Sequence, residues 1–192
     1  MPIASTARPR HPSTVHARAT AALPLVITAV LSVSVTAAAS SAPTPEVAGR
    51  TVDEPMAAAA LTAARALADG VLGAAVVSDE MVGELGYTPV LEHGLVAKAS
   101  GDCSSPVPLP AEFEPACRVH DLGYDLLRVA HRRGATIPPA LRPDLDSLLG
   151  RQMRGACGDR LPCRAMADVA TVAVHGNTVR QGYGAPVEGR LP

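Results

Sequence analysis

The sequence predicts an all-α domain, a small helical bundle stapled by disulfides. Apolar residues repeat at helical spacing over residues 115–133 and again over residues 141–155. The short, proline-containing connection between these segments makes them antiparallel neighbours. The chain also contains four cysteines, and an even number in a small domain with few aromatic residues is typical of a disulfide framework.

Composition limits the size of the domain and the class of its partners. The 192 residues are enough for one domain, and a formal net charge of -1 gives no electrostatic reason to expect a nucleic-acid partner. Hydrophobic residues make up 47% of the chain, but alanine supplies much of this and there is no tryptophan and one phenylalanine. The core must therefore be thin and built from Leu, Val and Ala, so covalent staples would matter.

The first 42 residues have the pattern of a signal peptide. The first 20 contain three arginines and no acidic residue, residues 21–35 are largely apolar, and residues 37–42 are the small residues that precede cleavage. The alternative is an uncleaved membrane anchor, since residues 21–39 approach the roughly 20 that a spanning helix needs. We favour the signal peptide, because a proline and several hydroxyl residues dilute the apolar run, and we expect a secreted protein.

A leader and two helices are expected between residues 43 and 100. Residues 41–55 contain three prolines and form a flexible leader. The alanine-rich run 56–77 is helical but interrupted by glycines, and a second short helix follows Ser78 and ends at Gly86.

Two interpretations of residues 43–100 are open. They are a propeptide that is removed after secretion, or their helices pack on the central pair and complete the core. We favour the second, because four large apolar residues of this stretch need burial. These residues are Leu61, Leu67, Val71 and Leu72.

Residues 115–133 form the central predicted helix. Pro115 suits a first helical turn and follows Glu114, while the basic pair and glycine of residues 132–134 are typical of a helix end. Four apolar residues at helical spacing can face the core. They are Val119, Leu122, Leu126 and Val129.

The same helix carries three chemically useful side chains. His120 and Tyr124 are one turn apart and share a face, whereas Asp121 points about 100 degrees away from His120. The ordinary pKa of histidine suits it to remove a proton from water at neutral pH. His120 is therefore the candidate base, and Asp121 is available for a separate role.

The next predicted helix, over residues 141–155, carries Asp146. Antiparallel packing brings Asp146 alongside His120, and an aspartate on one ring nitrogen of a catalytic histidine fixes its tautomer. A partly buried carboxylate needs a partner, and Tyr124 is also within reach as a hydrogen-bond donor. Asp146 lies at the edge of an apolar stripe formed by Leu141, Leu145, Leu148 and Leu149.

A last helix is expected over residues 164–180, ending before Gly182. The tail from residue 185 to residue 192 is expected to be disordered. One side of this helix is expected to be apolar and to consist of Met166, Val169, Val172 and Ala173.

Four cysteines allow three disulfide pairings, and sequence alone does not choose among them. The rival interpretation is a zinc site that uses Cys117 and His120. Zinc sites of that type take their cysteines as two close pairs, which the spacing of the first two cysteines does not provide. The cysteines are Cys103, Cys117, Cys157 and Cys163.

The segment from Cys117 through His120 and Asp121 to Tyr124 resembles the active-site helix of the secreted phospholipases A2. Gly123, before the tyrosine, is similar to the small prokaryotic branch, of the bacterial and fungal type. The resemblance extends over residues 101–184. Residues 102–106 resemble the calcium loop of that branch, and Asp146 lies eleven residues before a cysteine, where the family has the aspartate that orients its histidine.

This resemblance implies a phospholipase A2-like fold, disulfides Cys103–Cys117 and Cys157–Cys163, and calcium-dependent hydrolysis of the sn-2 ester of glycerophospholipids. It implies that His120 activates water, that Asp146 and Tyr124 support it, and that no serine is a nucleophile. Calcium would be held by Asp121 and by the loop that contains Gly101 and Asp102. The substrate would be a phospholipid at a membrane or micelle surface, and the enzyme a monomer.

The sequence departs from the family in the calcium loop and in its near absence of aromatic residues. The loop aspartate of the prokaryotic branch occupies the position of Gly101, whereas here the acid is Asp102, next to Cys103. The alternative function is therefore a secreted, non-catalytic module of the toxin type, which binds calcium or lipid on the same scaffold. Three further histidines have no expected role and should lie on the surface: His93, His131 and His175.

Overall fold

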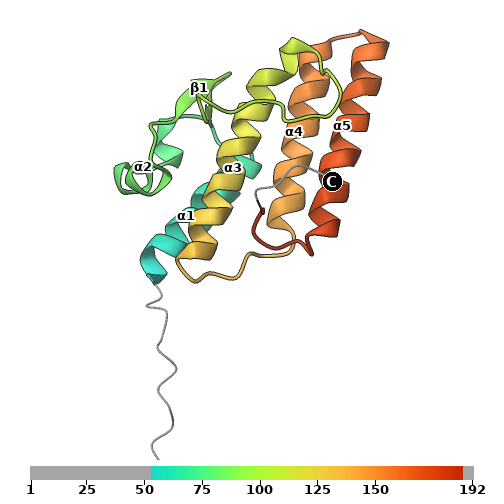
Figure 1. The fold of residues 1–192 in the computed structure, drawn as a ribbon. Helices are drawn as coiled ribbons and strands as arrows, with labels where there is room; N and C mark the ends of the chain where they lie inside the picture. The colour runs from blue at the N-terminus through green and yellow to red at the C-terminus, as the bar shows by residue number, and fades with distance from the viewer. Residues whose placement is uncertain (1–52, 188–192) are drawn as a thin grey trace, which may run out of the picture. The chain divides into compact units, whose positions relative to one another are not determined.

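A computed structural model describes residues 53–187 of the chain. The predicted signal peptide, most of the leader and the last five residues of the predicted tail lie outside the described residues. The described part is mostly helical, with five α-helices and one small hairpin (Figure 1). None of these helices is both long enough and apolar enough to cross a membrane.

The first helix of the described residues, α1 (Glu54–Ala68), packs against α3 (Glu114–Arg132) and α4 (Leu141–Cys157). Asp53 caps it by accepting a hydrogen bond from the backbone N–H of Met56, and a proline occupies its first turn. Its inward face is alanine-rich, which lets the helix axes approach closely. The buried residues are Ala57, Ala60, Ala63, Ala64, Leu67 and Ala68.

After α1 the chain leaves the predicted helical run. The 3₁₀ turn η1 (Ala74–Val76) and then α2 (Asp79–Leu85) follow. The N-cap and C-cap of α2 are the predicted Ser78 and Gly86. The expectation that Val71 and Leu72 are buried is wrong, since 67% of Leu72 is exposed. Because α1 ends at Ala68, these two residues lie on a surface loop and not on its inward face.

A two-stranded hairpin corrects the all-α prediction. Strand β1 (Val90–Glu92) pairs antiparallel with β2 (Leu95–Ala97) around His93 and Gly94, which both have positive φ angles, as type I′ turns require. Runs of three residues are too short for a periodicity to indicate a strand. All three residues of β2 are buried, and β2 packs against α3.

Three long helices form the rest of the bundle: α3 (Glu114–Arg132), α4 (Leu141–Cys157) and α5 (Leu161–Arg180). They run alternately in opposite directions, with α4 between α3 and α5 (Figure 1). The 3₁₀ turn η2 (Ala111–Phe113) leads into α3. Helix α5 begins three residues earlier than predicted, with Pro162 in its first turn. The apolar residues predicted to face the core from α3 and α4 are buried.

The prediction for the inward side of α5 is wrong for Val169, Val172 and Ala173, whereas Met166 is partly buried. Val172 is 72% exposed and Val169 is also exposed, whereas the buried residues of α5 are Cys163, Ala167 and Thr178. Alanine and valine occur all around this helix, so its apolar contrast is weak and packing against α4 determines which side is buried.

Both disulfides that the resemblance implies are present, Cys103–Cys117 and Cys157–Cys163. The first joins the loop before η2 to the first turn of α3, and the second joins the end of α4 to the start of α5. A second, smaller core lies beside the disulfides and contains their cysteines, Met153 and the only phenylalanine of the chain, Phe113. The staples therefore support the bundle end where the core is small.

Candidate active site

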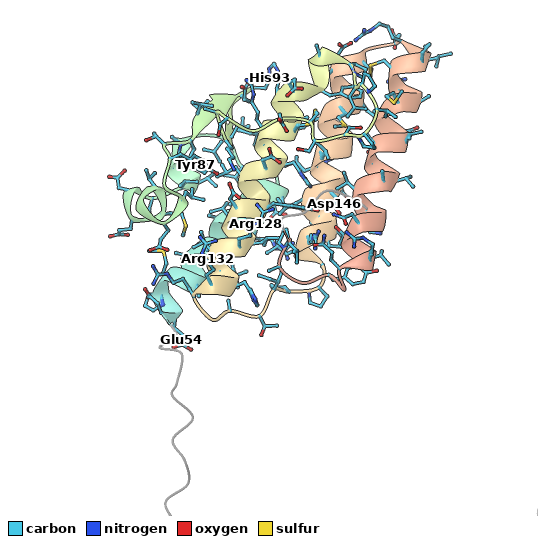
Figure 2. All side chains as sticks on the ribbon, viewed as in Figure 1. Glu54, Tyr87, His93, Arg128, Arg132 and Asp146 are labelled. Atoms are coloured by element: carbon cyan, nitrogen blue, oxygen red, sulfur yellow. A yellow bond between two sulfur atoms is a disulfide. The ribbon has the colours of Figure 1, made fainter. Side chains whose placement is uncertain are left out.

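Helices α3 and α4 bring His120 and Asp146 together, and Figure 2 shows Asp146 inside the bundle. Nε2 of His120 lies 2.9 Å from Oδ1 of Asp146. His120 is 9% exposed and Asp146 is 1% exposed. The close approach depends on Gly123, because a Cβ at this position would lie 2.7 Å from a methyl carbon of the Leu145 side chain on α4.

Asp146 accepts hydrogen bonds from three residues on two helices, His120 and Tyr124 on α3 and Thr178 on α5. The hydroxyl of Tyr124 on α3 donates to Oδ1 at 2.7 Å, and that of Thr178 on α5 donates to Oδ2 at 2.6 Å. Burial alone would raise the pKa of Asp146, but the hydrogen bonds from His120, Thr178 and Tyr124 and the charge of His120 hold it below its usual value. Asp146 is therefore a carboxylate at neutral pH, although it is buried.

The ionised Asp146 determines the tautomer of His120. A carboxylate only accepts hydrogen bonds, so the proton of the neutral imidazole resides on Nε2 and leaves Nδ1 as the acceptor. The rings of His120 and Tyr124 lie 4.0 Å apart between centroids, which limits rotation of the imidazole. The geometry thus provides a buried, oriented histidine with its basic nitrogen directed away from Asp146.

Arg142, which the sequence did not indicate as a site residue, is buried next to Tyr124. Nε of Arg142 donates to the Tyr124 hydroxyl at 3.2 Å, and Nη1 donates to the carbonyl oxygen of Gly184 at 3.2 Å. Burial and the negative charge of Asp146 raise the pKa of Tyr124 to about 12, so the phenol keeps its proton and acts as a donor. Arg142 places a positive charge near the buried carboxylate and connects the site to the turn after α5.

Asp121 faces the loop before η2, away from Asp146. Its Oδ2 accepts a hydrogen bond of 3.1 Å from the backbone N–H of Asp102. Gly101 is required beside it, because a Cβ there would lie 2.7 Å from this Oδ2 and 3.1 Å from the Cα of Arg118. Burial raises the pKa of Asp121, although the charges of His120 and Lys98 and the hydrogen bond from Asp102 oppose this. A partly buried carboxylate of this kind favours a nearby cation.

The loop residue Asp102 approaches Asp121 through its main chain. Its own carboxylate accepts a hydrogen bond of 2.8 Å from the hydroxyl of Ser104. Within residues 53–187, no group of three or more His, Cys, Asp or Glu side chains is arranged to hold a metal ion. A cation at Asp121 would therefore need main-chain carbonyl oxygens of the loop that contains Gly101, which are ligands that suit calcium.

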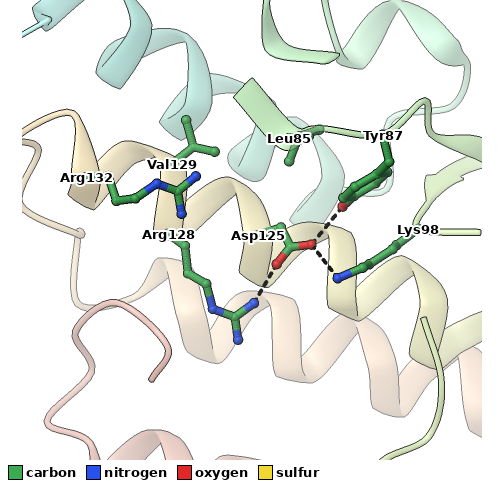
Figure 3. Close-up of a pocket in the computed structure, with 7 residues that line it drawn as sticks. All are labelled: Leu85, Tyr87, Lys98, Asp125, Arg128, Val129 and Arg132. Atoms are coloured by element: carbon green, nitrogen blue, oxygen red, sulfur yellow. Dashed lines mark hydrogen bonds and ion pairs between the residues drawn. The ribbon is translucent and has the colours of Figure 1, made fainter. Parts of the chain in front are cut away.

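A separate polar cluster surrounds Asp125, one turn after Asp121 on α3 (Figure 3). Its carboxylate accepts from the Tyr87 hydroxyl at 2.8 Å, Lys98 Nζ at 2.9 Å and Arg128 Nη1 at 2.6 Å, beside a cavity of about 230 Å³. Burial would raise the pKa of Asp125, but these donors hold it low. Tyr87 and Lys98 thus connect residues 87–98 to Asp125 on α3. Because three donors hold the pKa of Asp125 low, this carboxylate is not a candidate base.

His93, His131 and His175 are exposed, and none lies in the His120 site.

Comparison of the chain with family models, with curated proteins and with solved structures found no match.

Proposed function

We propose that this protein is a secreted, calcium-dependent phospholipase A2 that hydrolyses the sn-2 ester of glycerophospholipids, on a phospholipase A2-like fold. The observation that carries the proposal is the buried contact between His120 Nε2 and Asp146 Oδ1, which leaves Nδ1 as the basic nitrogen. Asp121 follows His120 on the same helix and faces a glycine-containing loop that a disulfide fastens to α3. These features together agree with the motif resemblance described above.

In this mechanism, His120 accepts a proton at Nδ1 from a water molecule as the water oxygen forms a bond to the ester carbonyl carbon. The negative charge of Asp146 stabilises the imidazolium that results. The tetrahedral intermediate then collapses, the bond to the glycerol oxygen breaks, and His120 returns the proton to that leaving oxygen. The products are a fatty acid and a lysophospholipid, and no bond forms between the substrate and the protein.

The residues around Asp121 fit a calcium ion. The Asp121 carboxylate is partly buried, and in the described residues one backbone N–H donates to it, so it has capacity for a cation. Main-chain oxygens of the loop at Gly101 and Asp102 would complete the ligands. Bound calcium would supply Lewis-acid stabilisation of the developing oxyanion and charge compensation for the lipid phosphate.

A non-catalytic secreted module that binds calcium or lipid is the second candidate. The observation in its favour is the Asp102 carboxylate, which is engaged by Ser104 and so does not contribute a second acidic ligand beside Asp121. Such a protein would bind phospholipid vesicles without releasing fatty acid.

The test is release of fatty acid from phospholipid vesicles by the purified, disulfide-bonded protein, with calcium or with chelator. We expect hydrolysis with calcium and its reversible loss with chelator. His120→Asn should abolish hydrolysis, whereas His131→Asn, the same change at an exposed histidine of the same helix, should not. Vesicle binding without fatty acid release would support the second candidate. Activity that survives chelation would remove the calcium assignment.

A further inference from the structure

Thr178 on α5 hydrogen-bonds to Asp146 of the candidate active site, and neither motif nor periodicity indicates it. Its side chain is fully buried near the C-terminal end of α5. Its Oγ1 lies 2.6 Å from Asp146 Oδ2 and 3.2 Å from the Tyr124 hydroxyl oxygen.

The available protons determine what each hydroxyl does. Tyr124 has one hydroxyl proton, and the 2.7 Å contact with Asp146 Oδ1 uses it. Thr178 also has one, and its shortest contact is with Asp146 Oδ2. No other donor to Oδ2 occurs in the described part of the chain, so this oxygen depends on Thr178.

The two oxygens of a carboxylate exchange places by rotation about a soft torsion angle. His120 and Tyr124 both hydrogen-bond to Oδ1, so these two bonds alone do not fix the position of Oδ2. A third donor on Oδ2 fixes the plane of the carboxylate, and therefore the direction in which Oδ1 accepts from His120 Nε2. Helix α5 thus controls the orientation of a pair of residues on α3 and α4.

We infer that Thr178 is a positioning residue, whose hydroxyl holds the Asp146 carboxylate in the orientation that keeps His120 in its productive tautomer. The inference rests on the proposed function for its kinetic consequence. It extends the site to a helix that contributes no other hydrogen bond to Asp146 among the described residues. The competing explanation is that Thr178 only fills space in the core.

Thr178→Val tests this inference, because valine has nearly the same shape and lacks the hydroxyl. We expect kcat to fall about tenfold, since hydrogen bonds to a charged group are among the stronger ones, with KM and calcium affinity within about twofold of wild type. Thr178→Ser restores the hydroxyl and should recover most of the activity. A residue that only fills space would give the reverse order, with valine close to wild type and serine impaired.

Thr171→Val is the matched control on the same helix. The Thr171 hydroxyl donates to the carbonyl oxygen of Ala167 at 2.7 Å, inside α5, and not to Asp146. Its loss should leave kcat unchanged. If Thr178→Val does not fold, Thr178→Ala lacks the hydroxyl without adding a methyl group and takes its place in the comparison with serine.

An NMR measurement separates failure of this inference from failure of the proposed function. The Nε2-bound proton of His120, assigned by its loss in His120→Asn, should give a sharp downfield resonance in the wild type and in Thr178→Ser. It should broaden or shift in Thr178→Val. An unchanged resonance in the valine variant would overturn the inference even in an active enzyme. The expected pattern in a protein that hydrolyses no lipid would support the inference while the proposed function fails.

Discussion

Replacement of Asp146 by asparagine removes one buried charge and leaves the shape of the side chain almost unchanged. The amide oxygen can still accept from His120 and Tyr124, and the amide nitrogen can donate to the Thr178 oxygen after its hydroxyl rotates. We therefore expect a cost of about 1 to 3 kcal/mol in folding free energy. The protein should remain folded and keep its affinity for calcium, because Asp121 faces away from this network.

The effect of Asp146→Asn on catalysis should be larger than its effect on folding. A neutral amide does not compensate the positive charge that forms on His120, and a flipped amide would place its nitrogen at Nε2 and favour the wrong tautomer. We expect turnover to fall on the order of a hundredfold or more, which corresponds to about 2.7 kcal/mol in activation free energy. Calcium-dependent fatty acid release, measured beside thermal unfolding and calcium titration, gives the three quantities.

The pH dependence of stability provides an independent check on Asp146. Its pKa is lowered in the folded state, so its stabilising contribution is complete above the unfolded pKa of about 3.9 and is lost as the pH falls through the folded value. Urea unfolding should show a steeper loss of stability below about pH 4 in the wild type than in Asp146→Asn. Wild-type turnover and an identical acid dependence in the variant would refute the role of Asp146.

Three further predictions concern the loop, the staples and the helix contact. Asp121→Asn should weaken calcium affinity by a larger factor than Asp102→Asn, because the Asp102 carboxylate is hydrogen-bonded to Ser104. Equal effects in titration calorimetry would contradict this ligand assignment. Replacement of both Cys103 and Cys117 by alanine should lower the free energy of unfolding in urea by roughly 3 kcal/mol and weaken calcium binding, because this disulfide joins residues 14 positions apart beside Asp121. Unchanged calcium affinity would refute the coupling between the disulfide and the calcium loop. Gly123→Ala should cost about 1 to 3 kcal/mol and lower kcat, since its Cβ would push α4 away from His120, whereas Gly155→Ala, which meets no neighbouring atom, should do neither.

Local patterns were sufficient to locate the helices that carry the site. Helical periodicity and end signals predicted α3 and α4 to within two residues at each end, because amphipathic helices with proline and glycine at their ends are specified by neighbouring residues. The hairpin was missed, because three-residue strands carry no periodic signal. The positive φ angles at His93 and Gly94 become evident only when the turn is seen.

The sequence by itself determined the spacing of His120, Asp121 and Tyr124 on one helix, and the short connection between two helices was enough to bring Asp146 beside them. Only the tertiary structure decided that Thr178 and Arg142 complete the environment of Asp146. The rotation of α5 about its axis depends on how it packs against α4, since alanine and valine surround that helix and give it little preference of its own. Arg142 belongs to a residue type that is rarely buried, and its guanidinium donates to the Tyr124 hydroxyl and to the Gly184 carbonyl oxygen, which only the folded chain brings beside it.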